Sequence, residues 1–183
     1  LNDRHTAFAL GFLCLVVSGG FFFLGRQWMG AAAFPVAFLI FMVPLPDALV
    51  NAMDTASQYA SAEAASWYFT LAGVPFLREE TIFRLPGITM KVAQECSGIR
   101  SSWVLLITSL VAAQLFLKSP WRRALFVFLV IPLGILRNGF RILVLGWLCV
   151  EVDPALIDSA IHHRGGPLFF ALSLIPLFLL LWW

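Results

Sequence analysis

One cysteine, Cys96, stands in a sequence context that favours chemistry. It lies in the run ECSGIRSS, residues 95–102, immediately before an apolar segment. Ser97 is a candidate helix N-cap, so the thiol is expected near the positive end of a helix dipole, about one turn from Arg100. Both effects favour the thiolate, which is the nucleophilic form, whereas Glu95 opposes it unless it pairs with Arg100 or Lys91. We interpret Cys96 as a reactive thiol.

The other two cysteines, Cys14 and Cys149, lie inside apolar runs. We interpret both as buried, inert small hydrophobes. Three scattered cysteines without a CxxC pair do not make a disulfide framework.

Two arginines, Arg137 and Arg141, interrupt the apolar run Leu125–Val150, with Asn138 and Gly139 between them. They are four residues apart and therefore share one face of a helix. Charges inside a membrane span are costly and usually mark function. Snorkelling toward an interface is the alternative explanation, and it suits Arg141 better than Arg137.

Two histidines, His162 and His163, precede the next apolar segment. An interfacial histidine is often only a solvated polar tip. Together with a thiol and an arginine, however, an imidazole supplies the groups for acyl transfer: a nucleophile, a base and a stabiliser of the oxyanion. A zinc site is the competing chemistry, but it needs more ligands at closer spacing. We therefore expect neither a metal nor a cofactor.

The composition predicts that the elements carrying these residues lie in a membrane. The chain of 183 residues is 61% hydrophobic and 12% charged, with a mean hydropathy of +0.90. Soluble domains carry about twice that charge. A net charge of +2 without a basic stripe argues against nucleic acid as a partner.

We predict an α-helical integral membrane protein with about five transmembrane helices, because each span needs about 20 apolar residues. The predicted spans are Ala7–Gly25, Gly30–Pro44, Ile99–Leu117, Ala124–Val150 and Pro167–Trp183. The basic loop 118–123 and Arg26 are expected in the cytoplasm, which places 47–98 and the acidic loop 151–166 on the outer face.

The outward segment 47–98 has structure of its own. Residues 47–71 show helical spacing and predict an interfacial amphipathic helix. Residues 81–85 and 88–93 flank Pro86-Gly87 and predict a short β-hairpin that leads toward Cys96. Without repeats or a linker, residues 1–183 are expected to form a single domain.

The ordered set of motifs resembles the exosortase/archaeosortase family of membrane transpeptidases. The similarity runs from about Asp47 to Trp183, and it begins with Leu85-Pro86, Val92-Ala93 and the run at 95–101. It continues through the segments at 121–123, 131–133 and 138–142, and ends with a His, three residues, Gly pattern at 162–166 followed by Phe169-Phe170.

The resemblance implies a catalytic triad of Cys96, Arg141 and His162. It also implies a multi-pass protein of a prokaryotic plasma membrane, with its active site on the outer face, that cleaves exported proteins at a C-terminal sorting signal of the PEP-CTERM kind. Such a signal combines a short motif, a membrane helix and a basic tail. Arg137 departs from the family pattern, which has a small residue there, and the doubled histidine leaves His163 as an alternative to His162.

The hypothesis is therefore a cysteine protease or transpeptidase that works at the membrane surface through a thioester, with membrane lipid around it. Arg100, Ser97, Asn138, Arg137, His163 and Glu95 are candidate supporting residues. The alternative is a protein that binds or transports an anionic lipid or solute through Arg137 and Arg141 and needs no thiol. A purely structural membrane subunit would tolerate changes at all three triad positions.

Overall fold

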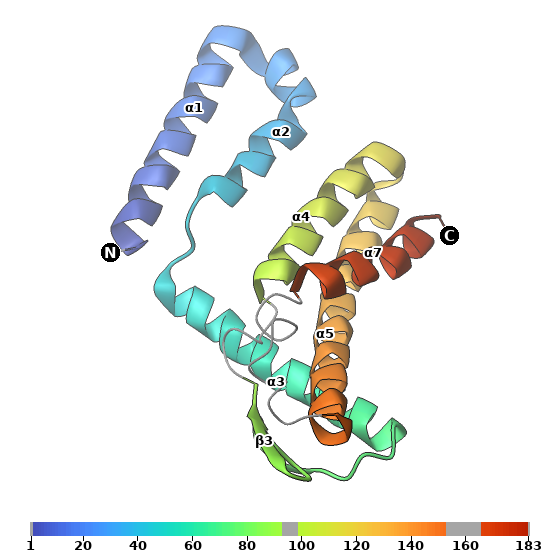
Figure 1. Cartoon of the computed structure of the whole chain (residues 1–183). Helices are drawn as coiled ribbons and strands as arrows, with labels where there is room; N and C mark the ends of the chain where they lie inside the picture. Colours follow the sequence, from blue (N-terminus) through green and yellow to red (C-terminus); the bar gives the residue numbers. More distant parts are fainter. Residues whose placement is uncertain (1, 93–98, 153–165, 183) are drawn as a thin grey trace. The chain divides into compact units, whose positions relative to one another are not determined.

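The structure, a computed structural model, describes residues 2–92, 99–152 and 166–182 (Figure 1). This part of the chain is mostly helical, with one small sheet, and it divides into two compact units, Leu1–Met53 and Asp54–Trp183. The expected single domain remains a prediction, because the placement of the two units relative to each other is not defined.

The first unit is a helical hairpin. Helix α1 (Asn2–Ala31) is followed by α2 (Ala33–Phe38) and the short 3-10 helix η1 (Leu39–Met42). Thr6 Oγ1 donates a hydrogen bond of 2.7 Å to the carbonyl of Pro44, so the returning chain ends beside the first turns of α1. Gly25, with φ of 76° and ψ of 172°, interrupts the helical dihedrals near the end of α1, a conformation that glycine adopts without strain.

Helix α1 presents large apolar side chains to its surroundings, including Phe22 and Phe23, each 82% exposed. Lipid solvates such a surface and water does not. Cys14 is exposed on the same helix, so the expected burial of this cysteine is wrong, because within the first unit little packs over α1. Cys149 is buried, as predicted, at 1% exposure.

The second unit is built from four helices and a sheet. The helices are α3 (Asp47–Leu71), which begins in the first unit, α4 (Ile99–Phe116), α5 (Pro120–Glu151) and α7 (Gly166–Trp182). Helix α3 coincides with the predicted interfacial helix. Pro120 starts α5 at the first helical turn, where its missing N–H costs nothing.

The predicted spans correspond to helices, but the count of five is not confirmed. Among the described residues only Arg4–Ala31 and Pro120–Glu151 are long and apolar enough to cross a membrane, or three spans if the bent pair Ala33–Met42 and Asp47–Leu71 is one. Ser101–Phe116 and Pro167–Trp182 are apolar but shorter. At about 1.5 Å per residue, the described parts of these two helices are shorter than a hydrocarbon core of about 30 Å.

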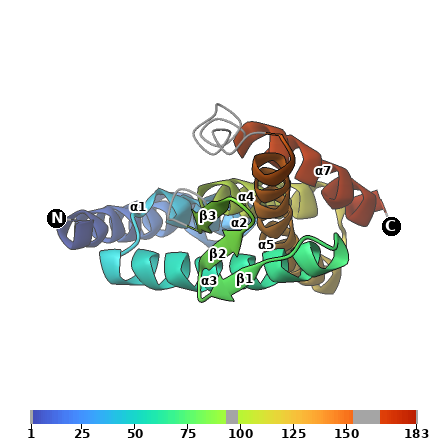
Figure 2. The same cartoon turned by 60° about the horizontal axis from the view of Figure 1, so that its bottom comes forward.

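The sheet contains the expected hairpin and one additional strand (Figure 2). Strands β2 (Ile82–Leu85) and β3 (Ile88–Lys91) pair antiparallel across Pro86-Gly87, where Gly87 has φ of 81°. Strand β1 (Leu77–Glu79) pairs antiparallel with β2 and was not predicted. Its three residues contain a single apolar side chain, so no alternation marks it in the sequence.

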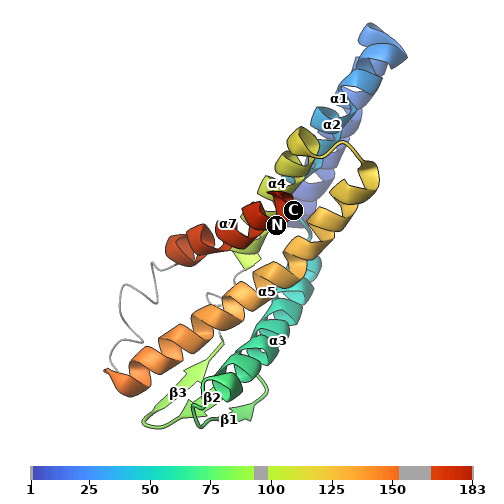
Figure 3. The same cartoon turned by 90° about the vertical axis from the view of Figure 1, so that its right-hand side faces the viewer.

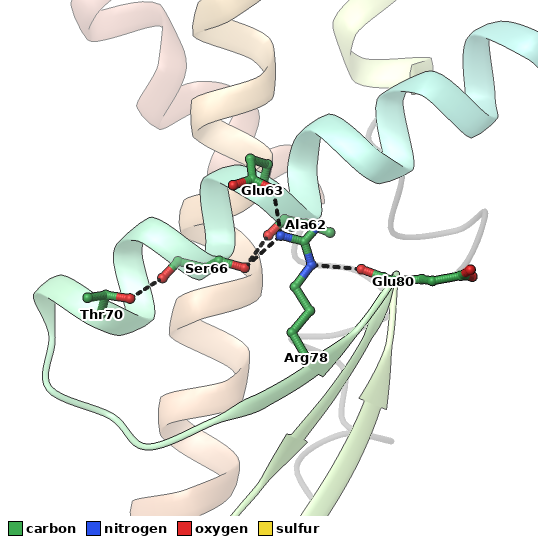
Figure 4. Close-up of polar contacts among 6 residues, drawn as sticks. All are labelled: Ala62, Glu63, Ser66, Thr70, Arg78 and Glu80. Carbon is green, nitrogen blue, oxygen red and sulfur yellow. Dashed lines mark hydrogen bonds and ion pairs between the residues drawn. The ribbon is translucent and has the colours of Figure 1, made fainter.

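Arg78 of β1 attaches the sheet to α3 (Figure 4). Its Nη1 contacts Glu63 Oε2 at 2.6 Å and Ser66 Oγ at 3.0 Å, and its Nε donates to the carbonyl of Glu80 at 2.7 Å. The guanidinium carbon also lies 6.0 Å from the ring centroid of Phe83. These contacts explain how so short a strand is held in place.

Two apolar cores flank α5. The first joins α3, the sheet and α5 through Phe69, Phe83, Leu85 and Ile142. The second joins α4, α5 and α7 through a cluster that consists of Leu105, Ala112, Ala113, Phe126, Val130 and Leu177. Helix α5 therefore contributes to both cores and is the central element of the second unit.

The α4–α5 connection is fixed by Arg123. Its Nε donates to the carbonyl of Leu117 at 2.7 Å, and its Nη1 donates to Gln114 Oε1 at 2.6 Å. An arginine that binds the last carbonyls of a helix satisfies groups that the helix itself leaves open. The two helices are thus held in a defined antiparallel pair at this end.

Helices α3 and α5 lie beside each other (Figure 3), and they approach closely at two glycines of α5, Gly139 and Gly146. A Cβ built on Gly139 would lie 2.6 Å from the Cβ of Ala64 and 3.0 Å from backbone atoms of Ala64 and Ala65. A Cβ on Gly146 would lie 2.7 Å from the ring of Phe69. Glycine at positions 139 and 146 of α5 therefore allows α3 to approach this closely.

The substitution Gly139→Ala is expected to destabilise the protein by about 1–3 kcal/mol, because the added methyl meets helix backbone that cannot yield locally. Thermal unfolding in detergent would measure the effect as a lowered Tm. Gly19→Ala in α1, where nothing lies within 4 Å, is the matched control and should leave Tm unchanged or slightly raised. Equal Tm values for both variants would contradict the close approach.

Candidate functional site

The predicted site residues divide into those that the structure describes and those that it does not. Cys96, Glu95, Ser97, His162 and His163 lie outside the described residues. Arg100 is the second residue of α4, but its side chain is also outside them. Arg137, Asn138 and Arg141 all lie on α5. The geometry of the site is therefore built from α5 and from the helices that it contacts.

Arg137 connects α5 to the beginning of α4. Its guanidinium Nη2 lies 2.7 Å from Ser101 Oγ and 3.5 Å from Ser102 Oγ, both in the first turn of α4. The arginine is only 8% exposed. Gly134, one turn earlier on α5, makes room for this contact, since a Cβ there would lie 3.0 Å from Ser102 Oγ.

Asn138 connects α5 to α3. Its Nδ2 donates a hydrogen bond of 2.9 Å to Ser61 Oγ, and the two residues are 2% and 0% exposed. Two polar side chains that bind each other inside an apolar layer fix the rotation of both helices, because any rotation would leave buried polar atoms without that bond. The adjacent Gly139 provides the close approach to α3 described above.

Phe140 connects α5 to the beginning of α7. Its ring packs edge to face against Phe169, with centroids 6.5 Å apart, and against Tyr68 of α3 at 6.0 Å. Such geometry is favourable for aromatic pairs. Phe169 lies in the first turn of α7 and is 6% exposed.

Arg141 completes this segment. It is half-buried and follows Arg137 by one helical turn. The positive charges of the two guanidinium groups repel each other. Two neighbouring cations on one face of an apolar helix create a potential that stabilises an anion nearby, such as a thiolate or an oxyanion.

Residues 137–141, which we call the hub segment, therefore contact three helices. Arg137 reaches α4, Asn138 reaches α3, and Phe140 reaches both α3 and α7. The helices that begin just after the predicted nucleophile and just after the predicted histidines are thus both attached to one turn of α5.

An apolar recess adjoins the hub segment. It has a volume of about 360 Å³ and opens between α5 and α7, with one residue from α3. Its wall is apolar except for Arg137, Ser173 and the hydroxyl of Tyr68. The lining residues are Tyr68, Leu133, Leu136, Arg137, Phe140, Leu172, Ser173, Ile175 and Pro176.

Metal ligation has no support in the described part of the chain. There, no group of three or more His, Cys, Asp or Glu side chains is arranged to hold a metal ion. Cys96 and His162, on which a zinc site would depend, fall outside this part, so the zinc alternative is not tested.

Sequence reasoning missed Ser61, Ser101, Tyr68 and the recess. Ser101 was part of the motif that follows Cys96, but nothing in the sequence indicated that its hydroxyl binds Arg137. Ser61 lies among small residues of α3, and small residues that meet a glycine on another helix were the available signal.

The comparisons with known proteins identify a family for the chain. Residues 1–179 match the model of the transmembrane exosortase family (Exosortase_EpsH). No curated protein and no solved structure matches the chain significantly. Because the match covers nearly all of a mostly helical chain with membrane-spanning helices, the chain belongs to the transmembrane exosortase family.

Proposed function

We propose that this protein is a membrane cysteine transpeptidase or protease that cleaves exported proteins at a C-terminal sorting signal. Membership of the exosortase family fits such an activity. The observation that carries the proposal is the hub segment, because one turn of α5 contacts the first turns of α4 and α7 and also contains Arg141.

Chain length supports the convergence of the three groups. Cys96 precedes Ile99, the first residue of α4, by three positions, and His162 precedes Gly166, the first residue of α7, by four. Even a fully extended chain spans only about 10 Å over three residues and about 14 Å over four. The thiol and the imidazole are therefore tethered within a short reach of two helix ends that both touch the hub segment.

The proposed reaction has two steps. The Cys96 thiolate attacks the scissile carbonyl carbon, and Arg141 stabilises the tetrahedral oxyanion. His162, as imidazolium, gives its proton to the leaving amine as the C–N bond breaks, which leaves a thioester on Cys96. Water or an acceptor amine then attacks the thioester, gives a proton to His162, and releases the thiolate. We propose the outer interface of a prokaryotic plasma membrane as the place of this reaction.

The apolar part of the sorting signal is proposed to pack on the recess between α5 and α7. The recess presents apolar side chains from both helices, and several of them, including Leu136, Leu172 and Ile175, are 44–56% exposed in the isolated chain. A membrane helix packs by shape complementarity rather than by the hydrophobic effect, so an indented apolar surface is a suitable contact. Its position beside Arg137 would bring the polar end of the signal to the hub segment.

The nucleophile is tested by Cys96→Ala, which is expected to lower processing of a sorting-signal substrate by about 10³-fold or more, because the substitution removes the thiol that is proposed to form the thioester. Cleavage in proteoliposomes and mass spectrometry of a trapped thioester would measure the loss. Cys14→Ala, at an exposed position of α1, is the matched control and should retain activity. Unchanged cleavage by Cys96→Ala would overturn the assignment of Cys96 as the nucleophile.

The histidine is tested by comparing His162→Ala with His163→Ala. The first is expected to lower kcat by about 10²–10⁴-fold, the usual contribution of a general acid–base group, and the second by less than about threefold. Single-turnover kinetics on the same substrate would separate them. The opposite order would assign the role to His163.

The recess is tested by Ile175→Trp, which fills space that the sorting signal is proposed to occupy. We expect KM to rise by about tenfold with kcat nearly unchanged, because the substitution removes binding that is equal in ground and transition states. Leu179→Trp, at a 59% exposed position of α7 outside the recess, is the matched control. The same KM for both variants would exclude the recess as the contact surface.

A further inference from the structure

We propose that Arg137 is a positioning residue of this site. It holds the first turn of α4 against α5 and so determines where the chain that precedes α4 delivers its thiol. This inference rests on the proposed function, in which Cys96 is the nucleophile. Arg141 stabilises the oxyanion in that proposal, whereas Arg137 acts through the position of α4.

The contact itself is well defined. Ser101 Oγ accepts a hydrogen bond of 2.7 Å from Arg137 Nη2, and Ser102 Oγ lies 3.5 Å from the same nitrogen. Hydrogen bonds from a charged donor are roughly twice as strong as neutral ones. Gly134 lets the turn of α4 that carries Ser102 approach α5, because any side chain there would meet the hydroxyl at about 3.0 Å.

The energetic cost of the arginine indicates that it has a role beyond packing. A guanidinium that is 8% exposed, inside a helix as apolar as α5, costs a few kcal/mol. Its position adds to that cost, because the first turn of a helix carries a partial positive charge and Arg141 is a second nearby cation. A charge held at this cost, on a hydrogen bond to the first turn of α4, is accounted for by a role in fixing the position of that turn.

Arg137 fixes the N-terminal end of α4 to α5. At the other end, Arg123 binds the carbonyl of Leu117 and the side chain of Gln114, so α4 is held to α5 at both ends by arginines of α5. Arg123 fixes the end next to the connecting turn, where the chain is already constrained. Arg137 fixes the opposite end, which is the end of α4 closer to Cys96 in the sequence.

The test compares three substitutions with a matched control. Ser101→Ala removes the hydrogen-bond acceptor without changing the arginine. Arg137→Gln removes both the positive charge and the planar guanidinium group, whereas Arg137→Lys keeps the charge but not the guanidinium geometry. Ser109→Ala is the control, because Ser109 is also a buried serine of α4, 0% exposed, but its hydroxyl donates within its own helix to the carbonyl of Leu106.

Two readouts are measured in proteoliposomes of the full chain: kcat and KM for a sorting-signal substrate, and the rate at which iodoacetamide alkylates Cys96. We expect Ser101→Ala to lower kcat by about tenfold, the scale of one charged hydrogen bond, with KM within about twofold. Arg137→Gln should lower kcat further, and the double variant that combines Ser101→Ala with Arg137→Gln should have the same kcat as Arg137→Gln alone. Arg137→Lys should fall between wild type and Arg137→Gln, and Ser109→Ala should match wild type.

The alkylation rate should fall in the same order, and this readout does not require that the protein processes any substrate. If wild type fails to process sorting signals but the order of alkylation rates holds, the proposed function fails and the positioning role of Arg137 stands. Additive losses in the double variant, or alkylation rates equal to wild type in Ser101→Ala and Arg137→Lys, would overturn the positioning role. If Arg137→Gln does not fold, Ser101→Ala and Arg137→Lys still decide the question.

Discussion

The second unit depends on the close approach of α3 and α5 at Gly139. At this point the two helix backbones are separated by so little space that a single methyl group would collide with the backbone of α3. Once this crossing is set, Phe69 reaches Gly146, and the sheet can pack between α3 and the C-terminal part of α5. The glycine therefore determines the position of the first core, and through it the position of the sheet.

The polar contacts beside this crossing determine orientation rather than distance. Apolar cores tolerate small rotations of their helices, because dispersion contacts have little directional preference. The bond between Asn138 and Ser61 and the bond between Arg137 and Ser101 do not tolerate them. The same turn of α5 thus contains a glycine that allows close approach and polar side chains that fix helix rotation. It orients both α3 and α4.

Sequence patterns predicted the helices and strands better than the contacts between them. The β2–β3 hairpin was predictable because Pro86-Gly87 is a turn signal, and α3 was predictable because its apolar residues follow helical spacing. Strand β1 was not, because Arg78 holds it through side-chain contacts with α3 that no local pattern records. The apolar segments were found, but composition alone did not fix the number of spans, since among the described residues two helices, or three if the bent pair is one span, are long and apolar enough. The arginines were marked by their cost in an apolar helix. Ser101, which binds Arg137, and Ser61, which binds Asn138, look ordinary until the helices are placed side by side.

The position of the sheet on α5 also bears on where the lipid boundary crosses this helix. Strands with open edges are excluded from hydrocarbon, because lipid offers no partners for unpaired N–H and C=O groups. Strands β2 and β3 pack on α5 at Ile142, and Leu85 of β2 lies close to Gly146, so this part of the helix is covered by a sheet whose open edge is unsuited to contact with lipid. We infer that the lipid boundary crosses α5 before Ile142, at the turn that contains Arg137 and Arg141. The low dielectric constant on one side of that turn strengthens the attraction of both guanidinium groups for an anion. In the proposed reaction, the water on the other side would supply protons and a nucleophile.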